Sequence, residues 1–213
     1  MDLLTAFIDI VLHLDAHLLA LTQQYGVWVY AILFLIIYCE TGLVITPFLP
    51  GDSLLFVAGA LCGMGALQLE LVLPLLVLAA FSGDNTNYWI GRLVGVRLLS
   101  SNEGRLIKRE HLDKTHAFFE KHGGKTIIFA RFLPIIRTFA PFVAGIGLMR
   151  YRLFMMFSAL GSLLWISSLT VAGYLFGNIP MVKNNLTLII IGIIAITLLP
   201  ALLELIRHRK HVA

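Results

Sequence analysis

Two arginines and two prolines interrupt an otherwise apolar stretch in the second half of the chain. Arg131, Pro134, Arg137 and Pro141 all lie within residues 126–149. An arginine near the centre of a bilayer costs about 3 kcal/mol on insertion scales unless it reaches water or a partner. Its planar guanidinium suits bidentate binding of a phosphate group and stays charged at any physiological pH. The pattern therefore predicts that Arg131 and Arg137 bind an anionic substrate in a polar cavity.

Two acidic residues lie in a related stretch nearer the N-terminus. Glu40 and Asp52 flank the segment Phe48-Leu49-Pro50, and a second Phe-Leu-Pro segment lies between the two arginines. A carboxyl group can exchange protons with an aqueous path, whereas an arginine in a protein keeps its proton. We therefore interpret Glu40 and Asp52 as the proton-coupling residues of the same site.

The four charges also have a purely structural interpretation. Ion pairs between the acids and the arginines would fix one stretch against the other, and they would relieve the cost of placing charge in a membrane. The two interpretations are compatible if a substrate phosphate displaces the acids from the arginines.

A secondary polar site is predicted in an apolar stretch long enough to span a bilayer. Its middle carries Asp84 and Tyr88, followed by Arg92. Polar groups at such a depth face other helices or a cavity. The alternative is that they only make hydrogen bonds between packed helices, with Gly83 and Gly91 as points of close approach. For Asp84 the sequence leaves both interpretations open.

Helix–break–helix hairpins are the elements that would position these side chains. A proline removes a backbone N–H and disfavours helix at the residue before it, so residues 126–149 are not expected to form one continuous span. Residues 27–64 are also interrupted, and their first apolar arm is shorter than the about 20 residues that a span requires. Interrupted backbone at membrane depth is tolerated where it is packed in protein or lines a cavity. We therefore interpret both segments as re-entrant hairpins, which enter the membrane and turn back.

The two hairpins belong to an internal repeat. Phe56-Val57-Ala58-Gly59 in the first matches Phe142-Val143-Ala144-Gly145 in the second. Downstream, the segment Gly91–Gly95 matches Gly173–Gly177 in the same order. Either match alone is weak in an apolar sequence, but both in one order indicate a duplication.

The composition is that of an integral membrane protein. The chain has 213 residues, of which 59% are hydrophobic and 13% are charged, so we expect an all-α membrane protein. Cys39 and Cys62 stand in apolar surroundings without metal-ligand spacing and are expected to be free thiols. No metal, cofactor or nucleic acid is expected as a ligand.

The distribution of basic residues predicts the orientation in the membrane. Residues 1–91 contain no Lys or Arg, whereas residues 92–213 contain all 16. Basic segments are enriched on the cytoplasmic side, which places residues 92–125, 150–152 and 207–210 in the cytoplasm if the second hairpin is re-entrant. The first hairpin then enters from the outer side, so the two repeats are inverted. Inverted repeats with broken helices near the midplane are typical of secondary transporters.

The whole chain, residues 1–213, is therefore expected to be one membrane domain with a cytoplasmic C-terminus. Its expected segments are an amphipathic helix (1–24), the first hairpin (27–64), a transmembrane helix (71–99), a cytoplasmic amphipathic segment that contacts phospholipid head groups (102–124), the second hairpin (126–149) and two transmembrane helices (153–176 and 186–206).

At three motifs the sequence resembles the DedA family of bacterial inner-membrane proteins. The motifs are Glu40 with Phe48-Leu-Pro-Gly-Asp52-Ser-Leu, Gly83-Asp84…Tyr88…Gly91-Arg92, and Phe129-Ala-Arg131-Phe-Leu-Pro134-Ile-Ile-Arg137-Thr138. The resemblance extends from Tyr25 to Lys210. It implies a multi-pass protein of the inner membrane, and it gives functional weight to Glu40, Asp52 and the two arginines.

The resemblance also implies a transporter linked to the proton-motive force. Family members are associated with recycling undecaprenyl phosphate, the lipid carrier of envelope synthesis, from the outer to the inner leaflet. A lipid phosphate, with undecaprenyl phosphate first among the candidates, is therefore the expected substrate. A proton-coupled exporter of small molecules or ions is one alternative. A passive scramblase is another, because related eukaryotic proteins scramble lipids. Whether the protein forms homo-oligomers stays open.

A membrane enzyme such as a lipid phosphatase is a further class to weigh. That chemistry needs a nucleophile and an acid–base group at the membrane face. All seven histidines lie in segments expected at the surface or the termini, and neither a Gly-x-Ser-x-Gly nor a His-Glu-x-x-His motif occurs. The sequence therefore does not favour an enzyme.

Overall fold

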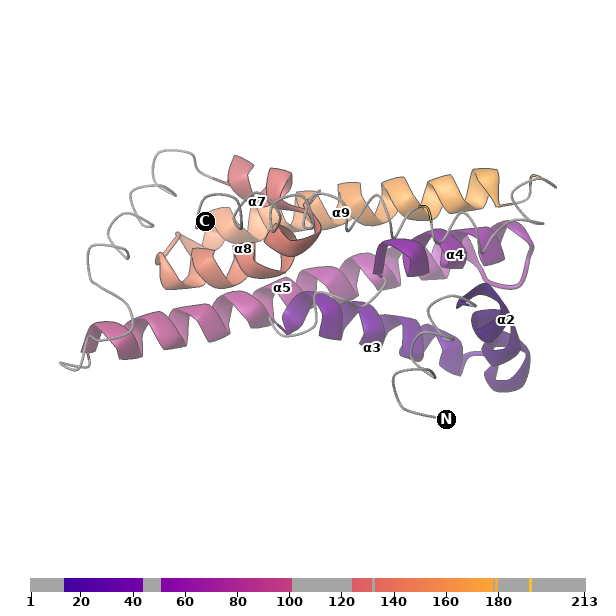
Figure 1. The fold of residues 1–213 in the computed structure, drawn as a ribbon, viewed down its shortest axis with the longest axis horizontal. Coiled ribbons are helices and arrows are strands. Elements are labelled where there is room, and N and C mark those ends of the chain that lie inside the picture. The colour runs from indigo at the N-terminus through magenta and orange to yellow at the C-terminus, as the bar shows by residue number, and fades with distance from the viewer. Residues whose placement is uncertain are drawn as a thin grey trace, which may run out of the picture. The chain divides into compact units, whose positions relative to one another are not determined.

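The computed structural model describes residues 14–43, 51–100, 124–131 and 133–177, with Ile179 and Gly192. The side chains of residues 14–16, 95–100, 134 and 135 lie outside this description. Every regular element in the described part of the chain is an α-helix (Figure 1). Nearly all of the expected segments 102–124 and 186–206, and the first half of the expected helix 1–24, fall outside the described residues.

Two short apolar helices occupy the arms of the first predicted hairpin. They are α3 (Trp28–Gly42), with 15 residues, and α4 (Gly51–Gly63), with 13 residues. Their lengths, about 22 and 20 Å, fall short of the bilayer core of about 30 Å. The preceding helix α2 (Leu14–Tyr25) packs against α4. Entry of the α3–α4 pair into a membrane stays a prediction.

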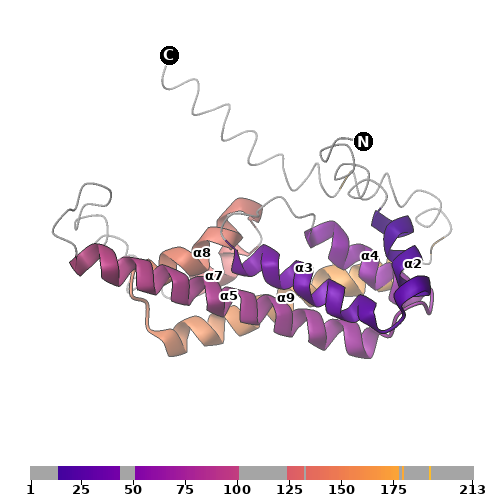
Figure 2. The ribbon, with the colours of Figure 1, turned by 90° about the horizontal axis from the view of Figure 1, so that it is seen from below.

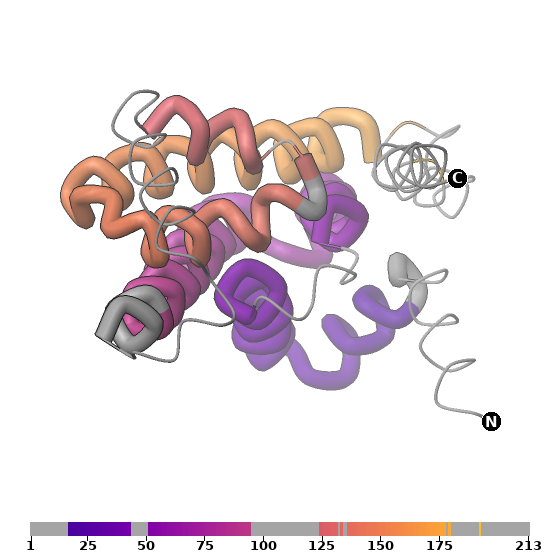
Figure 3. The backbone as a smooth tube through the Cα atoms, turned by 60° about the vertical axis from the view of Figure 1, so that its left-hand side comes forward, coloured from indigo at the N-terminus to yellow at the C-terminus, as the bar shows by residue number. Residues whose placement is uncertain are grey.

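The second predicted hairpin consists of α7 (Lys125–Ala130) and α8 (Pro134–Ile146), which lie against one another (Figure 3). The helical conformation is interrupted at Leu133, whose backbone is extended with φ −113° and ψ 108°. Pro134 then begins α8, where its missing N–H costs no helical hydrogen bond. Pro141 lies inside α8, so the helix continues through the second proline and the break occurs at the first.

Two helices in the described part of the chain are long and apolar enough to cross a membrane. The apolar stretch Leu69–Val94 of α5 (Leu69–Ser100) and the whole of α9 (Tyr151–Phe176) contain 26 residues each, or about 39 Å of helix. They match the predicted spans 71–99 and 153–176. Figure 2 shows α5 as one uninterrupted helix.

The chain divides into two compact units, each drawn from segments far apart in the sequence. The first unit contains Met1–Phe34, Pro50–Leu75 and Ile166–Ala213, and the second unit contains Leu35–Leu49 and Leu76–Trp165. Helices α3, α5 and α9 are each divided, with one part in the first unit and the other part in the second unit. All the residues described below as the candidate site belong to the second unit.

Glycines bring two backbones into contact within the second unit. A Cβ on Gly91 of α5 would collide with the carbonyl oxygen of Phe142 in α8, and one on Gly145 of α8 would collide with the carbonyl oxygen of Tyr88. The two helices therefore touch backbone to backbone, as small residues allow in membrane proteins. The predicted close approach at Gly91 is confirmed.

The first unit contains the same contact between the other copies of the repeated segments. A Cβ on Gly173 of α9 would collide with the carbonyl oxygen of Phe56 in α4, and one on Gly59 would collide with the carbonyl oxygen of Thr170. In each unit, the Phe-Val-Ala-Gly segment of one repeat packs against the first glycine of the matched downstream segment of the other repeat, which is Gly91 or Gly173. The duplicated contact supports the internal repeat, while the inversion of its copies in a membrane stays a prediction.

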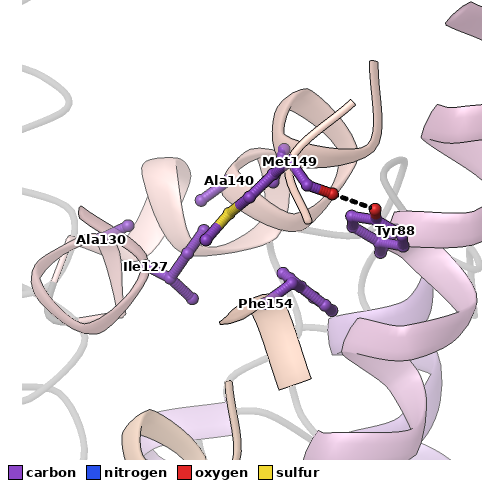
Figure 4. Close-up of a cluster of buried hydrophobic side chains, with 7 residues drawn as sticks. Tyr88, Ile127, Ala130, Ala140, Met149 and Phe154 are labelled. Carbon is purple, nitrogen blue, oxygen red and sulfur yellow. Dashed lines mark hydrogen bonds between the residues drawn. The ribbon is translucent and has the colours of Figure 1, made fainter. Parts of the chain in front are cut away.

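A cluster of buried hydrophobic side chains fills the second unit where α5, α7, α8 and the start of α9 meet (Figure 4). Its members are Tyr88, Ile127, Ala130, Ala140, Ala144, Met149 and Phe154. The rings of Tyr88 and Phe154 stack with their centroids 4.4 Å apart. This packing holds the α7–α8 hairpin in place and thereby positions the two arginines that the hairpin carries.

Candidate functional site

Arg131 follows the last residue of α7, at the turn that leads into α8. Its backbone N–H donates to the carbonyl oxygen of Ile128 at 3.2 Å. Its Nη2 donates to Oδ2 of Asp84 on α5, and Ser158 of α9 donates its hydroxyl to the same oxygen at 2.6 Å. Asp84 and Arg131 are only 2% and 4% exposed. Groups from three parts of the chain therefore meet at one buried carboxylate oxygen.

Arg137 lies in the first turn of α8, and its backbone N–H donates to the carbonyl oxygen of Leu133 at 2.8 Å. Its Nη2 donates to Oε1 of Glu40, in the last turn of α3, at 2.5 Å. Arg137 is 6% exposed and Glu40 is fully buried. The structure thus brings together two residues that the sequence assigned to one site.

One indole ring lies beside both guanidinium groups. The ring centroid of Trp165 on α9 is 4.6 Å from Cζ of Arg137 and 5.8 Å from Cζ of Arg131. A guanidinium within about 6 Å of an indole ring is attracted to the negative face of that ring. The two cations therefore share one neutral partner, while each has a carboxylate of its own.

Asn87 of α5 fixes the Glu40–Arg137 pair relative to its own helix. Its Nδ2 donates to the carbonyl oxygen of Thr41 at 3.1 Å and to that of Thr138 at 2.7 Å. These two threonines directly follow the paired Glu40 and Arg137 in the sequence. A single buried amide therefore joins α3 and α8 next to the ion pair.

Nε of Arg131 and Oδ1 of Asn87 are buried polar atoms without a hydrogen-bond partner among the described residues. A buried donor or acceptor left without a partner costs about 1–3 kcal/mol. The Nε–H of Arg131 is therefore a donor that a further group, such as an anion oxygen, can use.

The second carboxylate of the site differs from the one that the sequence predicted. Asp52 is half-buried in the first turn of α4 and belongs to the first unit. The carboxylate bound to Arg131 is instead that of Asp84, which the sequence assigned to the secondary polar site. A proton-coupling role for Asp52 stays a prediction.

Tyr88 and Arg92, the other residues of the predicted secondary site, make a separate set of contacts. The hydroxyl of Tyr88 donates to the carbonyl oxygen of Met149 at 2.5 Å (Figure 4), and Nη1 of Arg92 donates to the Tyr88 hydroxyl at 3.0 Å. The guanidinium of Arg92 also lies 5.6 Å from the ring centroid of Trp89. The predicted secondary site therefore divides into Asp84, which joins the arginines, and a structural anchor at Tyr88 and Arg92.

Comparison with known proteins identifies the family. The VTT domain family matches residues 49–175, more than half of the chain. Protein DedA of Escherichia coli K12 is 57% identical over 100% of this chain and 98% of its own length. The chain belongs to the DedA family.

Two more distant relatives of this DedA-family chain are also named as membrane proteins. The uncharacterized membrane protein Rv0364 of Mycobacterium tuberculosis H37Rv is 43% identical over 82% of this chain and 78% of its own length. Inner membrane protein YqjA of Escherichia coli K12 is 33% identical over 85% of this chain and 82% of its own length. No solved structure matches the chain.

Because the DedA family consists of membrane proteins, the charged residues of the site belong to a membrane protein. Asp84 lies inside the apolar stretch of α5, and its partners surround it within the second unit. The formal charges of Glu40, Asp84, Arg131 and Arg137 sum to zero. Such pairing is needed because unpaired charge is costly in a membrane. The expected ion pairing of acids with arginines is confirmed for Glu40 and Arg137, and Asp84 is the acid that pairs with Arg131.

Sequence reasoning missed Trp165 and Ser158 as parts of the site. A tryptophan or a serine within an apolar span is common and gives no signal by itself. Asp84 did give a signal, because an acid at this depth is expensive without a partner. Among the described residues, no group of His, Cys, Asp and Glu side chains could hold a metal ion. Within the described residues, Cys39 and Cys62 are not joined in a disulfide.

Proposed function

We propose that this protein moves a lipid phosphate across the bacterial inner membrane in a process linked to the proton-motive force, with undecaprenyl phosphate as the substrate. The observation that carries the proposal is the double ion pair, in which two buried arginines flank one indole ring and each is neutralised by a carboxylate. Membership of a family with relatives named as inner-membrane proteins supports the location.

The arginines bind the phosphate head group in place of their carboxylates. Each guanidinium presents N–H donors in a planar fork that fits phosphate oxygens. The lipid tail stays in the bilayer, so only the head group needs to enter the site. Because the arginines never lose their charge, binding and release are controlled by what else binds to them.

Protonation of the acids supplies that control. A neutral Glu40 holds Arg137 less strongly, so proton binding and phosphate binding favour each other, as linkage requires. Asp52, in the first turn of α4, is proposed to take up protons from the outer side. Deprotonation toward the cytoplasm restores the acid–arginine contacts and expels the head group.

The proposed membrane arrangement is one domain with two re-entrant hairpins. The α3–α4 hairpin enters from the outer side, the α7–α8 hairpin enters from the cytoplasm, and the C-terminus is cytoplasmic. Cysteines introduced at the exposed residues Gln68 and Lys125, in a background lacking Cys39 and Cys62, should then react with a non-permeant reagent from opposite sides. Labelling of both from one side contradicts the inverted arrangement.

Transport is tested with purified protein in liposomes that contain a polyprenyl phosphate. A non-permeant probe reads the phosphate exposed in the outer leaflet while a proton gradient is imposed. We expect gradient-dependent transfer, and we expect it to disappear in Arg131→Ala and Arg137→Ala. Transfer that ignores the gradient and survives both substitutions would replace the proposal with a scramblase. Flux of soluble ions would replace it with an exporter, and release of inorganic phosphate with an enzyme.

A further inference from the structure

We infer that Asp84 is a second exchangeable carboxylate of this site. A bound phosphate group displaces one carboxylate from each arginine. It enters as a dianion, and each displaced acid takes up one proton. The inference rests on the proposed phosphate-binding function. It goes further by specifying the charge of the ligand and the residue that releases Arg131.

The two ion pairs are built alike although they come from different helices. In each, Nη2 of an arginine on the α7–α8 hairpin contacts one carboxylate oxygen of a buried acid, Asp84 on α5 or Glu40 on α3. Both guanidinium groups lie beside Trp165. A ligand that takes both arginines must therefore separate both pairs.

The Arg131–Asp84 pair uses only part of the guanidinium fork. Arg131 contacts Asp84 through Nη2, while its buried Nε has no hydrogen-bond partner among the described residues. Bidentate binding of a phosphate uses two neighbouring N–H donors of the fork. A phosphate at Arg131 can use Nε together with Nη2, so it gains a donor that Asp84 leaves unused.

Ser158 gives the displaced carboxyl group a partner. Its hydroxyl donates to the Asp84 oxygen that Arg131 contacts, at 2.6 Å, and it is fully buried on α9. When Arg131 moves to a phosphate, this hydrogen bond remains. The charged groups around Asp84 are Arg131 and Arg137, and Glu40 acts on Arg131 in turn.

Charge balance then selects the ligand. In the described part of the chain, the two ion pairs of the site hold two cations and two anions. Exchange of both carboxylates for a phosphate monoester dianion, with one proton on each displaced acid, keeps the sum at zero. A singly charged phosphodiester would leave one positive charge, and a triply charged diphosphate would leave one negative charge. Because net charge is costly in a membrane, the site is expected to prefer the monophosphate.

The test is equilibrium binding to the purified full chain in detergent micelles at pH 8. The probes are farnesyl phosphate, farnesyl diphosphate and inorganic phosphate. In Asp84→Asn, Arg131 no longer has to leave a charged partner, so farnesyl phosphate should bind about tenfold more tightly or better. Glu70→Gln, an exposed acid in the first turn of the same helix, should not alter binding.

Two serines of α9 provide a test that does not depend on the folding of Asp84→Asn. Ser158→Ala removes a hydrogen bond that favours the ionised form of Asp84 over the protonated form in the complex, so farnesyl phosphate should bind about threefold more tightly or better. Ser162 is also buried, but its hydroxyl donates to the backbone carbonyl of Ser158 at 2.8 Å. Ser162→Ala is therefore the matched control and should bind like the parent protein.

The outcomes separate this inference from the proposed function. Unchanged affinity in Asp84→Asn, equal effects of the two serine variants, or equal binding of monophosphate and diphosphate would each overturn the role of Asp84. If neither Arg131→Gln nor Arg137→Gln weakens binding, the proposed function itself fails. Equal affinity for inorganic and farnesyl phosphate would keep the exchange but assign the site to free phosphate rather than to a lipid.

Discussion

Gly161 of α9 lies directly against the side chain of Arg131. A Cβ at this glycine would come within 2.9 Å of Cδ and 3.0 Å of Nε of the arginine. Arg131 therefore reaches Asp84 past a glycine, and a side chain at position 161 would require the arginine to shift.

Gly161→Ala is therefore expected to reduce transport without removing any charged group. The added methyl group must push Arg131 away from its present position, which should cost about 1–3 kcal/mol of stability and lower the transport rate about tenfold or more. The measurements are thermal unfolding in detergent and transfer in liposomes. Gly192→Ala is the control, because a Cβ there meets nothing within 4 Å. Equal activity of the two variants would show that Arg131 need not stay in place.

Lysine should not replace either arginine. Arg131→Lys and Arg137→Lys keep the positive charge but lose the planar fork that binds a phosphate through two donors. We expect each to reduce transport about tenfold or more, while the protein remains in the membrane at its normal level. Arg152→Lys changes an exposed arginine near the start of α9 and should transport normally. Full activity of the site lysines would mean that the site needs only point charges.

The Glu40–Arg137 pair should be coupled in stability. Glu40→Gln and Arg137→Gln each leave a buried charge without its carboxylate or guanidinium, which typically costs about 3–5 kcal/mol. The double variant leaves two neutral amides and should recover a large part of that loss. A double-mutant cycle on thermal or denaturant unfolding measures the coupling. Additive losses would show that the two side chains do not stabilise one another. Transport should be lost in all three variants.

Tyr88→Phe should reduce stability while sparing function. It removes the hydroxyl that donates to Met149 and accepts from Arg92, so a loss of about 1–3 kcal/mol is expected. Transport per folded molecule should stay close to the parent value, because the ion pairs are untouched. Tyr174→Phe, at an exposed position of α9, is the control for stability. A transport defect without a stability defect would place Tyr88 in the site after all.

Phosphate affinity should rise as the pH falls through the titration of the site carboxyl groups. Protonation neutralises Glu40 and Asp84 and frees the arginines, so the complex takes up protons and lower pH favours it. The gain should level off near pH 6, where a phosphate monoester itself takes up a second proton. Glu40→Gln and Asp84→Asn should each flatten the profile. A flat profile of the parent protein would contradict proton coupling at these acids.

The sequence was sufficient to predict the long spans, the break before α8 and three of the four residues that form the two ion pairs. Apolar length separated the spans in α5 and α9 from the shorter arms, and Pro134 marked the break before α8. The cost of charge in a membrane identified Glu40, Arg131 and Arg137 as residues that need partners, and the structure gives each of them one.

The sequence could not predict which acid pairs with Arg131. That choice depends on how the α7–α8 hairpin folds against α5 and α9, and it is decided by packing around Gly161 and by the hydroxyl of Ser158. Pro141 shows the same limit, because a proline breaks or merely interrupts the hydrogen bonding of a helix according to its surroundings. Such outcomes depend on tertiary packing between segments far apart in the sequence, so no local sequence pattern predicts them.

In each unit, a segment from the first half of the chain packs against a segment from the second half, and this imposes an order on biosynthesis. The ribosome completes α4 and α5 before α8 and α9 exist, so neither Gly59 nor Gly91 can find its partner helix while only the first half has been made. Glu40 and Asp84 are likewise inserted before Arg131 and Arg137 are translated. A buried acid without a counter-charge is forced toward its neutral form, so we expect the carboxyl groups of the nascent first half to stay uncharged until the arginines of the second half reach them.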